Sequence, residues 1–346
     1  MSSEPTCALP IAHTDRVLLG HGSGGKLTGQ LIERLILPAF ANPALDALDD
    51  QAILTAGGTR LAFTTDSYVV TPIFFPGGDI GELAVNGTIN DLAVGGARPI
   101  ALSLAFILEE GLPIADLERV IGSAKRAAER AGVSIVTGDT KVVERGHGDQ
   151  MFINTSGIGV VPAGVELGSA KIRPGDAIVL SGPIGDHGVA IMAHRAGLSL
   201  GDLVSDTAAL HSLCEAIVRS GAEVHAMRDP TRGGVAATLV EIATRRRLGI
   251  EADEAAIPVR EPVRGACELL GLDPLLVANE GKLVAFVAER DADRLVAAMR
   301  EHPLGRHATR IGFVTGAHPS VVELVTPVGG RRTLDLPFAE PLPRIC

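Results

Sequence analysis

A stretch rich in proline and glycine, residues 162–175, interrupts the middle of the chain. Before it, strand-like and helix-like segments alternate, and the same alternation restarts at Asp176. This composition is typical of a boundary between domains. The chain has 346 residues, 46% of them apolar, and is therefore long enough to bury two cores. The predicted units are an N-terminal segment with a glycine-rich loop (1–40), a first domain (41–161), a linker (162–175), a second domain (176–335) and a C-terminal tail (336–346).

The charge balance argues against a nucleic-acid surface. Acidic residues outnumber basic ones by 41 to 31, there is one Tyr and no Trp, and no run of basic residues occurs. No span reaches eighteen apolar residues, and the N-terminus lacks a basic region followed by an apolar run. We therefore expect no nucleic-acid partner, no membrane insertion and a cytoplasmic location. An acidic protein that handles phosphates would need backbone amides, a few placed cations and metal ions.

The four cysteines, Cys7, Cys214, Cys267 and Cys346, are scattered without CxxC spacing. This pattern fits neither a disulfide framework nor a zinc site, so any important cysteine is expected to act singly.

The tail combines three prolines with a terminal thiol. Pro337, Pro341 and Pro343 fix φ and remove three backbone donors, which predicts a semi-stiff extended arm. Cys346 at its end could visit sites that a core cysteine cannot reach. Arg344 favours the thiolate and the adjacent terminal carboxylate disfavours it. The alternative is a frayed terminus that happens to stop at Cys.

Carboxylates gather where two neighbouring strands are expected. Asp49 and Asp50 precede a short strand, and Asp66 ends the next one, with a Gly57-Gly58 hairpin between the two. Mg²⁺ is commonly held by a few carboxylates together with phosphate oxygens. The two clusters therefore predict a magnesium site.

A third set of polar groups is predicted on a helix over residues 80–94, capped by Asp79. Asn86, Asn90 and Asp91 lie at one-turn spacing on this otherwise apolar segment. Because polar groups on an apolar helix are costly unless paired, we favour a further Mg²⁺ or phosphate contact over a solvated face.

Asp139 and Lys141 are predicted to lie just past a buried strand, where chemistry commonly occurs. Asp139 would be a further metal ligand. Lys141 would be a cation for phosphate or, if desolvated, a proton-transfer group. The alternative for both is a surface turn.

The second half contributes two more candidate stretches. The turn Met227–Gly234 opens a helix and brings free amides, Asp229 and two arginines, including Arg232, into one place. Glu280, at a polar break between two expected strands, is a candidate base or an exposed bulge residue. His187, after a glycine-rich turn, is expected to cap or pack rather than to catalyse.

Six motifs occur together in the order of a known superfamily. The chain is similar to the ATP-binding superfamily that includes aminoimidazole ribonucleotide synthetase, selenophosphate synthetase and thiamine monophosphate kinase. Within it, the initial HGSGG and the final Pro343-Arg-Ile-Cys346 resemble the HypE family of hydrogenase maturation factors. The motifs are His21-Gly-Ser-Gly-Gly25, Asp49-Asp50, Thr65-Asp66-Ser67, Asn90-Asp91 through Pro99, Gly138-Asp139-Thr140-Lys141 and Asp229-Pro-Thr-Arg-Gly-Gly234.

The resemblance implies an α+β fold of two domains, each a sheet covered by helices on one face. It also implies a homodimer joined through the N-terminal sheets, with ATP near that junction. The implied metal ligands for Mg²⁺ are Asp49, Asp50, Asp66, Asp91 and Asp139. The implied nucleotide contacts are Asp49, Asp66, Asn90, Asp91, Asp139, Lys141 and Arg232.

The resemblance also implies an activity centred on Cys346. In this family the carbamoyltransferase HypF loads the terminal thiol with a carbamoyl group. ATP-dependent dehydration then converts the thiocarboxamide into a thiocyanate, and its cyanide passes to iron held by the HypC–HypD complex for the [NiFe] centre. Glu280 and Lys141 are the implied acid/base pair. Two other functions stay open: a small-molecule kinase or ATP-dependent synthetase of the same superfamily, and a nucleotide-binding scaffold.

Overall fold

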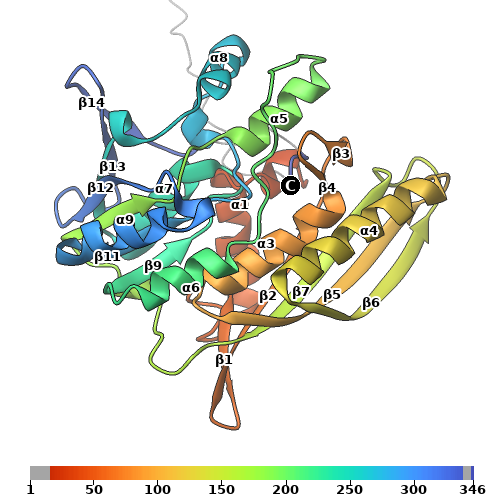
Figure 1. Ribbon diagram of the computed structural model, residues 1–346, viewed down its shortest axis with the longest axis horizontal. Coiled ribbons are helices and arrows are strands. Elements are labelled where there is room, and N and C mark those ends of the chain that lie inside the picture. Colours follow the sequence, from red (N-terminus) through yellow and green to blue (C-terminus); the bar gives the residue numbers. More distant parts are fainter. Residues whose placement is uncertain (1–15, 338–343) are drawn as a thin grey trace, which may run out of the picture.

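The computed structural model describes residues 16–337 and 344–346. Cys7 and residues 338–343 of the predicted tail lie outside the described part. Figure 1 shows two neighbouring domains, each built on one large sheet, with the C-terminus between them. The predicted α+β fold of two sheets covered by helices is confirmed. In the part of the chain that the structure describes, no helix is long and apolar enough to cross a membrane.

The N-terminal sheet has five strands in the order β1-β2-β7-β5-β6. Helices α3 and α4 cover one of its faces (Figure 1). No helix among the described residues covers the other face. Its strands and helices are β1 (Ala52–Ala56), β2 (Thr59–Tyr68), α3 (Ile80–Val94), β5 (Arg98–Glu109), α4 (Ile114–Ala131), β6 (Ser134–Val143) and β7 (Met151–Val160), with a small β3–β4 ribbon at Phe74–Phe75 and Gly78–Asp79.

Helix α3 is the central element of the first domain. The predicted cap is confirmed: the Asp79 side chain accepts hydrogen bonds from the backbone N–H groups of Gly81 and Glu82. Nearly every residue of α3 is buried, because one side packs on the sheet and another on the second domain. Asn86, Thr88 and Asn90 of α3 are therefore buried against protein, whereas Glu82 and Asp91 stay partly accessible.

The C-terminal sheet has seven strands in the order β14-β13-β10-β12-β8-β11-β9. Its strands are β8 (Asp176–Leu180), β9 (Val224–Arg228), β10 (Gly249–Asp253), β11 (Val284–Ala288), β12 (Thr309–Thr315), β13 (Val322–Val325) and β14 (Arg331–Leu334). The helices of this domain are α5 (Asp186–Arg195), α6 (His211–Arg219), α7 (Gly234–Arg246), α8 (Glu261–Leu270) and α9 (Ala292–Arg300).

Helices cover this second sheet on both faces, which corrects the expectation of one covered face. Ile178 and Leu180 of β8 pack with α7, whereas Ala177 and Val179 pack with α6 and α9. Strands β8 and β11 are apolar at nearly every position and fully buried. Such continuous apolar runs are typical of a sheet that is covered on both sides.

The described part of the chain begins with a glycine-rich loop. A helical stretch follows as α1 (Lys26–Leu31), a π-helical turn (Ile32–Ile36) and α2 (Leu37–Phe40). Lys26 ties this segment to the far end of the chain: its N–H donates to the Pro337 carbonyl, and its Nζ lies 2.6 Å from Asp335 Oδ2.

Two local predictions are wrong. The stretch from Leu275 to Ala278 is not a strand, because Asp273 caps a 3-10 turn at Pro274–Leu276. Asp139 and Lys141 do not lie past a buried strand. They lie within β6, which is an edge strand and exposed over nearly its whole length.

Candidate active site

A cavity of about 440 Å³ opens between the two domains and gathers most of the predicted site. Its walls come from the glycine-rich loop, the loop before β1, the end of β2, α3, the turn after β9, the segment before β11 and the C-terminus. The polar residues on its walls include Asp49, Asp50, Asp66, Tyr68, Asp91, Arg228, Asp229, Arg232, Glu241, Arg245, Glu280 and Cys346.

Three carboxylates from separate elements converge in this cavity. Asp50 lies before β1, Asp91 on α3, and Asp229 in the turn between β9 and α7. One oxygen of each lies within 4.8 Å of the others. Thr64 Oγ1 orients Asp91 by donating to its Oδ2 at 2.7 Å. The chain has thus brought three like charges together across a domain boundary.

This crowding changes the protonation of the cluster. Burial raises the pKa of Asp50 to about 6, although the Arg228 guanidinium, 2.8 Å from its Oδ1, acts in the opposite direction. Burial also raises the pKa of Asp91 and of Asp229 well above the ordinary value, and the neighbouring carboxylates add to the effect. Each acid therefore holds its proton more firmly than an isolated aspartic acid does.

The donor set fits a hard divalent cation. Mg²⁺ prefers oxygen ligands and is commonly held by carboxylates together with phosphate oxygens. Within the described residues, Asp50 Oδ2 is buried and has no hydrogen-bond partner. A cation there would satisfy that oxygen and offset the repulsion among the three acids.

Glu280 is buried beside the same cavity. Its side chain is 3% exposed, and Oε1 has no hydrogen-bond partner in the described part of the chain. Burial, followed by the charges of Asp229 and Asp206, raises its pKa well above the ordinary value. The predicted base is therefore a desolvated carboxyl group aimed at the cavity rather than an exposed bulge residue.

The backbone of Glu280 is held from two directions. Asp206 accepts a hydrogen bond from the Glu280 N–H at 3.0 Å and also pairs with Lys282 at 2.8 Å. Asn90 Nδ2 lies 3.4 Å from the Glu280 carbonyl. These contacts fix the position of the carboxyl group.

The C-terminus forms part of the cavity wall opposite the acids. Cys346 is half-buried, and its negative charge is the largest cause that raises the pKa of Arg232. Tyr68 donates a hydrogen bond to Asp66 Oδ2 at 2.9 Å. Burial raises the pKa of Asp66, and Arg232 and Tyr68 partly offset that rise. A thiol, a guanidinium and a buried base thus face one space.

The glycine-rich loop closes the cavity beside Arg232. Gly24 has φ +81°, and a Cβ at this position would lie 3.0 Å from Arg232 Cβ. Only glycine adopts this backbone without strain while packing so closely. Thr28 Oγ1 accepts a hydrogen bond from the Gly24 N–H.

Asn90 differs from what its motif implies, whereas Asp49 lies where its motif implies. Asn90 is 1% exposed, and its side chain donates to the Ala208 carbonyl and accepts from the Leu210 N–H. Because its hydrogen bonds go to protein, it joins α3 to the second domain and is not on the cavity wall. Asp49 lies on the wall, where its Oδ1 accepts from the Ser169 N–H at 3.2 Å.

The single chain does not bring Asp139 and Lys141 into the cavity. They pair with Ala105 and Ile107 in the parallel β5–β6 register, on the face of the sheet opposite α3. Each has a side chain about two-thirds exposed, and Lys141 Nζ lies 2.7 Å from Asp139 Oδ2. The Lys141 hydrogen bond lowers the pKa of Asp139. The expectation of a site past a buried strand is therefore corrected.

Three residues at the centre of the site were not assigned by sequence reasoning. The sequence indicates Asp229 only as a carboxylate in a tight turn and assigns no role to Tyr68 or Arg228. The signal was present for Asp229, since it opens the Asp229-Pro-Thr-Arg motif. That it faces Asp50 depends on how the two domains pack.

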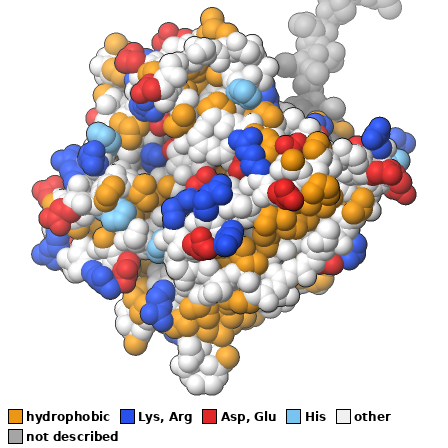
Figure 2. All heavy atoms as spheres, turned by 45° about the vertical axis from the view of Figure 1, so that its right-hand side comes forward, with side chains coloured by type: hydrophobic (Ala, Val, Ile, Leu, Met, Phe, Trp, Pro, Cys, Tyr) orange, Lys and Arg blue, Asp and Glu red, His pale blue; other side chains and the backbone are white. Residues whose placement is uncertain are grey.

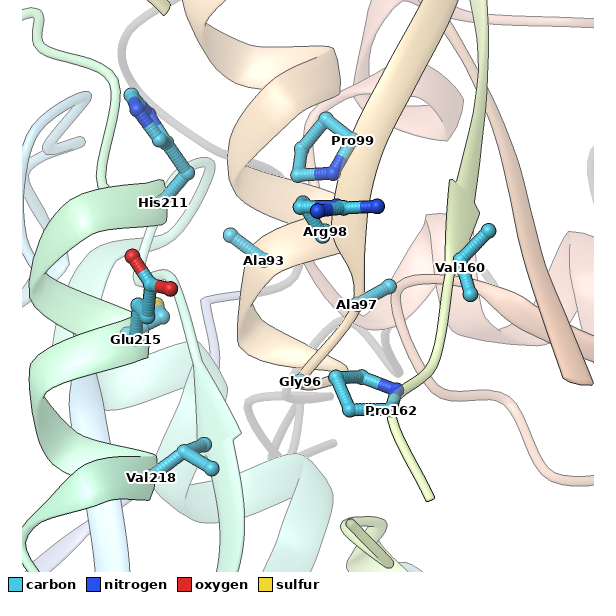
Figure 3. A pocket seen from close by; sticks show the side chains of 11 residues that line it. Ala93, Gly96, Ala97, Arg98, Pro99, Val160, Pro162, His211, Glu215 and Val218 are labelled. Carbon is cyan, nitrogen blue, oxygen red and sulfur yellow. The ribbon is translucent and has the colours of Figure 1, made fainter.

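A second cavity lies between α3, β5 and α6 (Figure 3). Its volume is about 340 Å³, and Ala93, Pro99, Val160 and Val218 give it a mostly apolar lining. The acidic cluster and the terminal thiol are not on its walls. We therefore assign the candidate active site to the cavity between the domains, because the acidic cluster and Cys346 line that cavity.

Two family models match adjoining parts of the chain. Residues 48–161 match the AIR synthase related protein, N-terminal domain, and residues 173–325 match its C-terminal domain. A curated relative, carbamoyl dehydratase HypE of Rhizobium leguminosarum bv. viciae, is 54% identical over 333 residues, which cover 96% of this chain and 95% of the relative.

Solved structures agree with this relationship. A crystal structure of the hydrogenase maturation protein HypE in complex with ATP is 50% identical, with a TM-score of 0.81, and covers 96% of this chain and 100% of that one. A chain of a HypE–HypF complex is 45% identical, with a TM-score of 0.84, and covers 89% of this chain and 99% of that one. With the family models, the curated relative and the solved structures in accord, the chain belongs to the HypE family of carbamoyl dehydratases, within the AIR synthase related proteins.

Proposed function

We propose that the protein uses ATP to remove water from a carbamoyl group carried on the sulfur of Cys346. The observation that carries the proposal is the position of Cys346 on the wall of the cavity that Glu280, Arg232 and the acidic cluster also line. The name of the curated relatives and the ATP complex of a close structural relative support it. The product supplies the cyanide ligand of the [NiFe]-hydrogenase iron centre.

The chemistry requires a better leaving group and the loss of two protons from nitrogen. In S–C(=O)–NH₂, the amide oxygen attacks the γ-phosphorus of ATP while the bond to the β–γ bridging oxygen breaks and ADP leaves. Loss of one N–H proton gives an O-phosphoryl imidate. Loss of the second N–H proton, with cleavage of the C–O bond, gives S–C≡N and phosphate. Atoms and charges balance as one carbamoyl group and ATP giving one thiocyanate, ADP, hydrogen phosphate and one proton: of the two protons lost from nitrogen, one ends on the phosphate and the other is released.

The residues of this chain have distinct tasks in that sequence. Glu280, desolvated and fixed by its backbone contacts, takes protons from the nitrogen. Arg232, on the cavity wall, faces the developing negative charge on the transferred group. Asp50, Asp91 and Asp229, with Asp49 and Asp66 on the same cavity wall, would hold Mg²⁺. The bound ion would neutralise and orient the phosphates of ATP.

A direct experiment tests this function. The protein is incubated with HypF, carbamoyl phosphate and ATP, and the C-terminal peptide is analysed by mass spectrometry. We expect a carbamoyl adduct on Cys346 that then loses one water. Cys346→Ala should keep the fold and bind ATP but accept no adduct. An adduct on another cysteine, or one that never loses water although ATP is present, would contradict the proposal.

We propose HypF and the HypC–HypD complex as partners, because the loaded group must be supplied and the cyanide must be delivered. A HypE–HypF complex among the structural relatives supports the first of these. A cytoplasmic location stays a prediction of the sequence.

We further propose a homodimer in which the open face of the N-terminal sheet is the interface. Leu54 and Phe63 on β1 and β2 and Ile107 on β5 are exposed large hydrophobic residues of this face. Figure 2 shows hydrophobic side chains gathered on the right-hand side of the molecule, which carries the N-terminal domain. Asp139 and Lys141 lie on the same face, so the proposed dimer would bury them where they could serve the partner's cavity.

A further inference from the structure

The last three residues dock against the body of the protein through an isolated β-bridge. Ile345 pairs with Val70 in an antiparallel bridge. The Val69 N–H donates to the Cys346 carbonyl oxygen at 3.2 Å, and the Thr71 N–H donates to the Arg344 carbonyl at 3.1 Å. Ile345 is 1% exposed and packs in the core cluster that contains Tyr68, Val70 and Val189. The position of the thiol therefore depends on this docked segment.

A buried histidine on helix α5 completes the docking. His187 is fully buried, and its Nε2 lies 2.7 Å from the Ile345 carbonyl oxygen. Its Nδ1 lies 2.8 Å from Ser205 Oγ. Ser205 Oγ already accepts a hydrogen bond from the Thr207 N–H, so its proton is free to donate to Nδ1. Nε2 then carries the proton and donates to the tail.

The surroundings keep this tautomer in place. Burial lowers the pKa of His187, which favours the neutral ring. The Phe75 ring packs on it in an edge arrangement, with centroids 5.6 Å apart and planes at 89°. The imidazole thus has one orientation, and that orientation points at the tail. Figure 1 shows the C-terminus close to α5 and the β3–β4 ribbon.

Arg195, at the end of the same helix, makes a second bridge. Its guanidinium donates both to the Thr71 carbonyl and to the Arg344 carbonyl, which joins the tail to the segment that it pairs with. Arg344 in turn lies 3.2 Å from Asp149 Oδ2, and its φ of 60° is in the left-handed region. A non-glycine residue keeps that conformation only where its surroundings hold it.

We propose that His187 and Arg195 are positioning residues that latch the tail and so hold the Cys346 sulfur in the cavity for dehydration. Neither contacts the reacting atoms in this scheme, since both bind backbone carbonyls of the two preceding residues. The latch consists of hydrogen bonds to backbone carbonyls, so the tail can undock by breaking these bonds without any change in charge. Opening it would release the thiol to a partner, and closing it would return the loaded sulfur to Glu280. The docking of the tail by His187 and Arg195 stands without the proposed function. Only its purpose, to hold the sulfur for dehydration, rests on that function.

The first test measures only how fast the Cys346 thiol is alkylated. In a Cys7→Ser background, the rate of alkylation of Cys346 by iodoacetamide reports how often the tail is undocked, because Cys214 and Cys267 are buried. The variants are His187→Ala, His187→Gln and Arg195→Ala, and the matched control is His194→Ala, an exposed histidine on the same helix. The loss of one hydrogen bond predicts alkylation about two- to tenfold faster in the two alanine latch variants. His187→Gln should recover part of the loss, since its amide can donate to the Ile345 carbonyl.

The second test separates the two half-reactions. We expect HypF to load His187→Ala and Arg195→Ala at the wild-type rate or faster, whereas single-turnover dehydration of the pre-loaded protein becomes slower by a similar factor. A merely structural role would slow both steps or neither. If the wild type itself never dehydrates its loaded tail, the proposed function fails. If the wild type does so, and the folded latch variants match it in alkylation and in dehydration, the latch is refuted. Should His187→Ala not fold, His187→Gln and Arg195→Ala still decide the outcome.

Discussion

Glu280 carries its chemistry in a single buried carboxyl group. Burial and the nearby acids raise its pKa well above the ordinary value, so Glu280 holds its proton to a higher pH than an ordinary glutamic acid does. A general base must be deprotonated, and the active fraction of Glu280 therefore grows as the pH rises through that raised pKa. The arginine opposite lowers the same pKa and keeps the carboxylate within reach.

From this follows a prediction on rate and pH. The single-turnover dehydration rate of the loaded wild-type protein should rise with pH, whereas Glu280→Gln should lose about 10²- to 10⁴-fold in rate and show no such rise. HypF should load both proteins equally. The measurement is quenched-flow mass spectrometry of the tail peptide across a pH series. A Glu280→Gln variant that retains the wild-type profile would assign the base to another residue.

The acidic cluster links protonation to stability. Asp50 has a pKa of about 6 in the folded protein, against 3.8 as its ordinary value, so the folded state binds this proton more tightly than the unfolded state does. Its stabilising contribution is fully present below pH about 4 and is lost as the pH rises through about 6. Cation binding has the opposite preference, because the ligands must be deprotonated.

We therefore expect two opposite trends in thermal unfolding. Without metal, the Tm contribution of the cluster should fall between about pH 4 and pH 7, and added Mg²⁺ should raise Tm more at about pH 7 than at about pH 5. Asp50→Asn should weaken both trends, while Asp116→Asn on the exposed first turn of α4 should alter neither. An Mg²⁺ effect of equal size in Asp50→Asn would place the ion elsewhere.

At the scale of elements, α3 connects the two domains and the site. Its Asp79 cap and its limits agree with the sequence-based prediction, because capping and helix-forming residues act locally. The sequence could not show that Asn90 bonds to the second domain while Asp91, one residue later, faces the cavity. That difference depends on which neighbour meets each side of the helix. The side of the sheet on which Asp139 lies depends in the same way on the β5–β6 register.

A glycine on α3 gives an element-scale prediction. A Cβ at Gly87 would lie 2.1 Å from the Tyr68 hydroxyl, which bonds to Asp66. Gly87→Ala should therefore destabilise the protein by about 1–3 kcal/mol, although glycine to alanine within a helix usually stabilises. Gly122→Ala on α4 is the control, since its Cβ meets only the end of the Arg126 side chain. Urea unfolding, followed by circular dichroism and by fluorescence of the only tyrosine, measures both. If Gly87→Ala were as stable as the wild-type protein, the helix would have shifted to accommodate the added methyl group.

At the scale of the whole molecule, the motifs predict the family and its fold, but they do not predict how the two domains pack. Their order along the chain indicated the family, and with it the α+β fold and the group of acids before β1, on β2 and on α3. What no motif contains is the meeting of Asp50 with Asp229, whose side chains come from different domains. The burial of both faces of the second sheet is likewise a property of the assembled chain.

The proposed dimer gives a prediction at this scale. If Lys141 serves the partner's cavity while Glu280 serves its own, Lys141→Ala and Glu280→Gln should each be nearly inactive as homodimers. Mixed after reversible dissociation, they should regain up to about a quarter of the wild-type rate, because one of the two cavities in each heterodimer is intact. A mixture of Lys141→Ala with Lys141→Ala/Glu280→Gln is the control that should gain nothing. Failure of the first mixture, with heterodimers verified by native mass spectrometry, would keep both residues in one subunit.

The anchoring of Pro337 to Lys26 limits how far the sulfur can travel. Nine residues follow Pro337, and even a fully stretched chain of that length spans only about 30 Å. If Lys26 keeps Pro337 in place while the tail undocks, the thiol can move no farther than that length. Whatever enzyme loads it must then bring its own reaction centre close to the body of this protein.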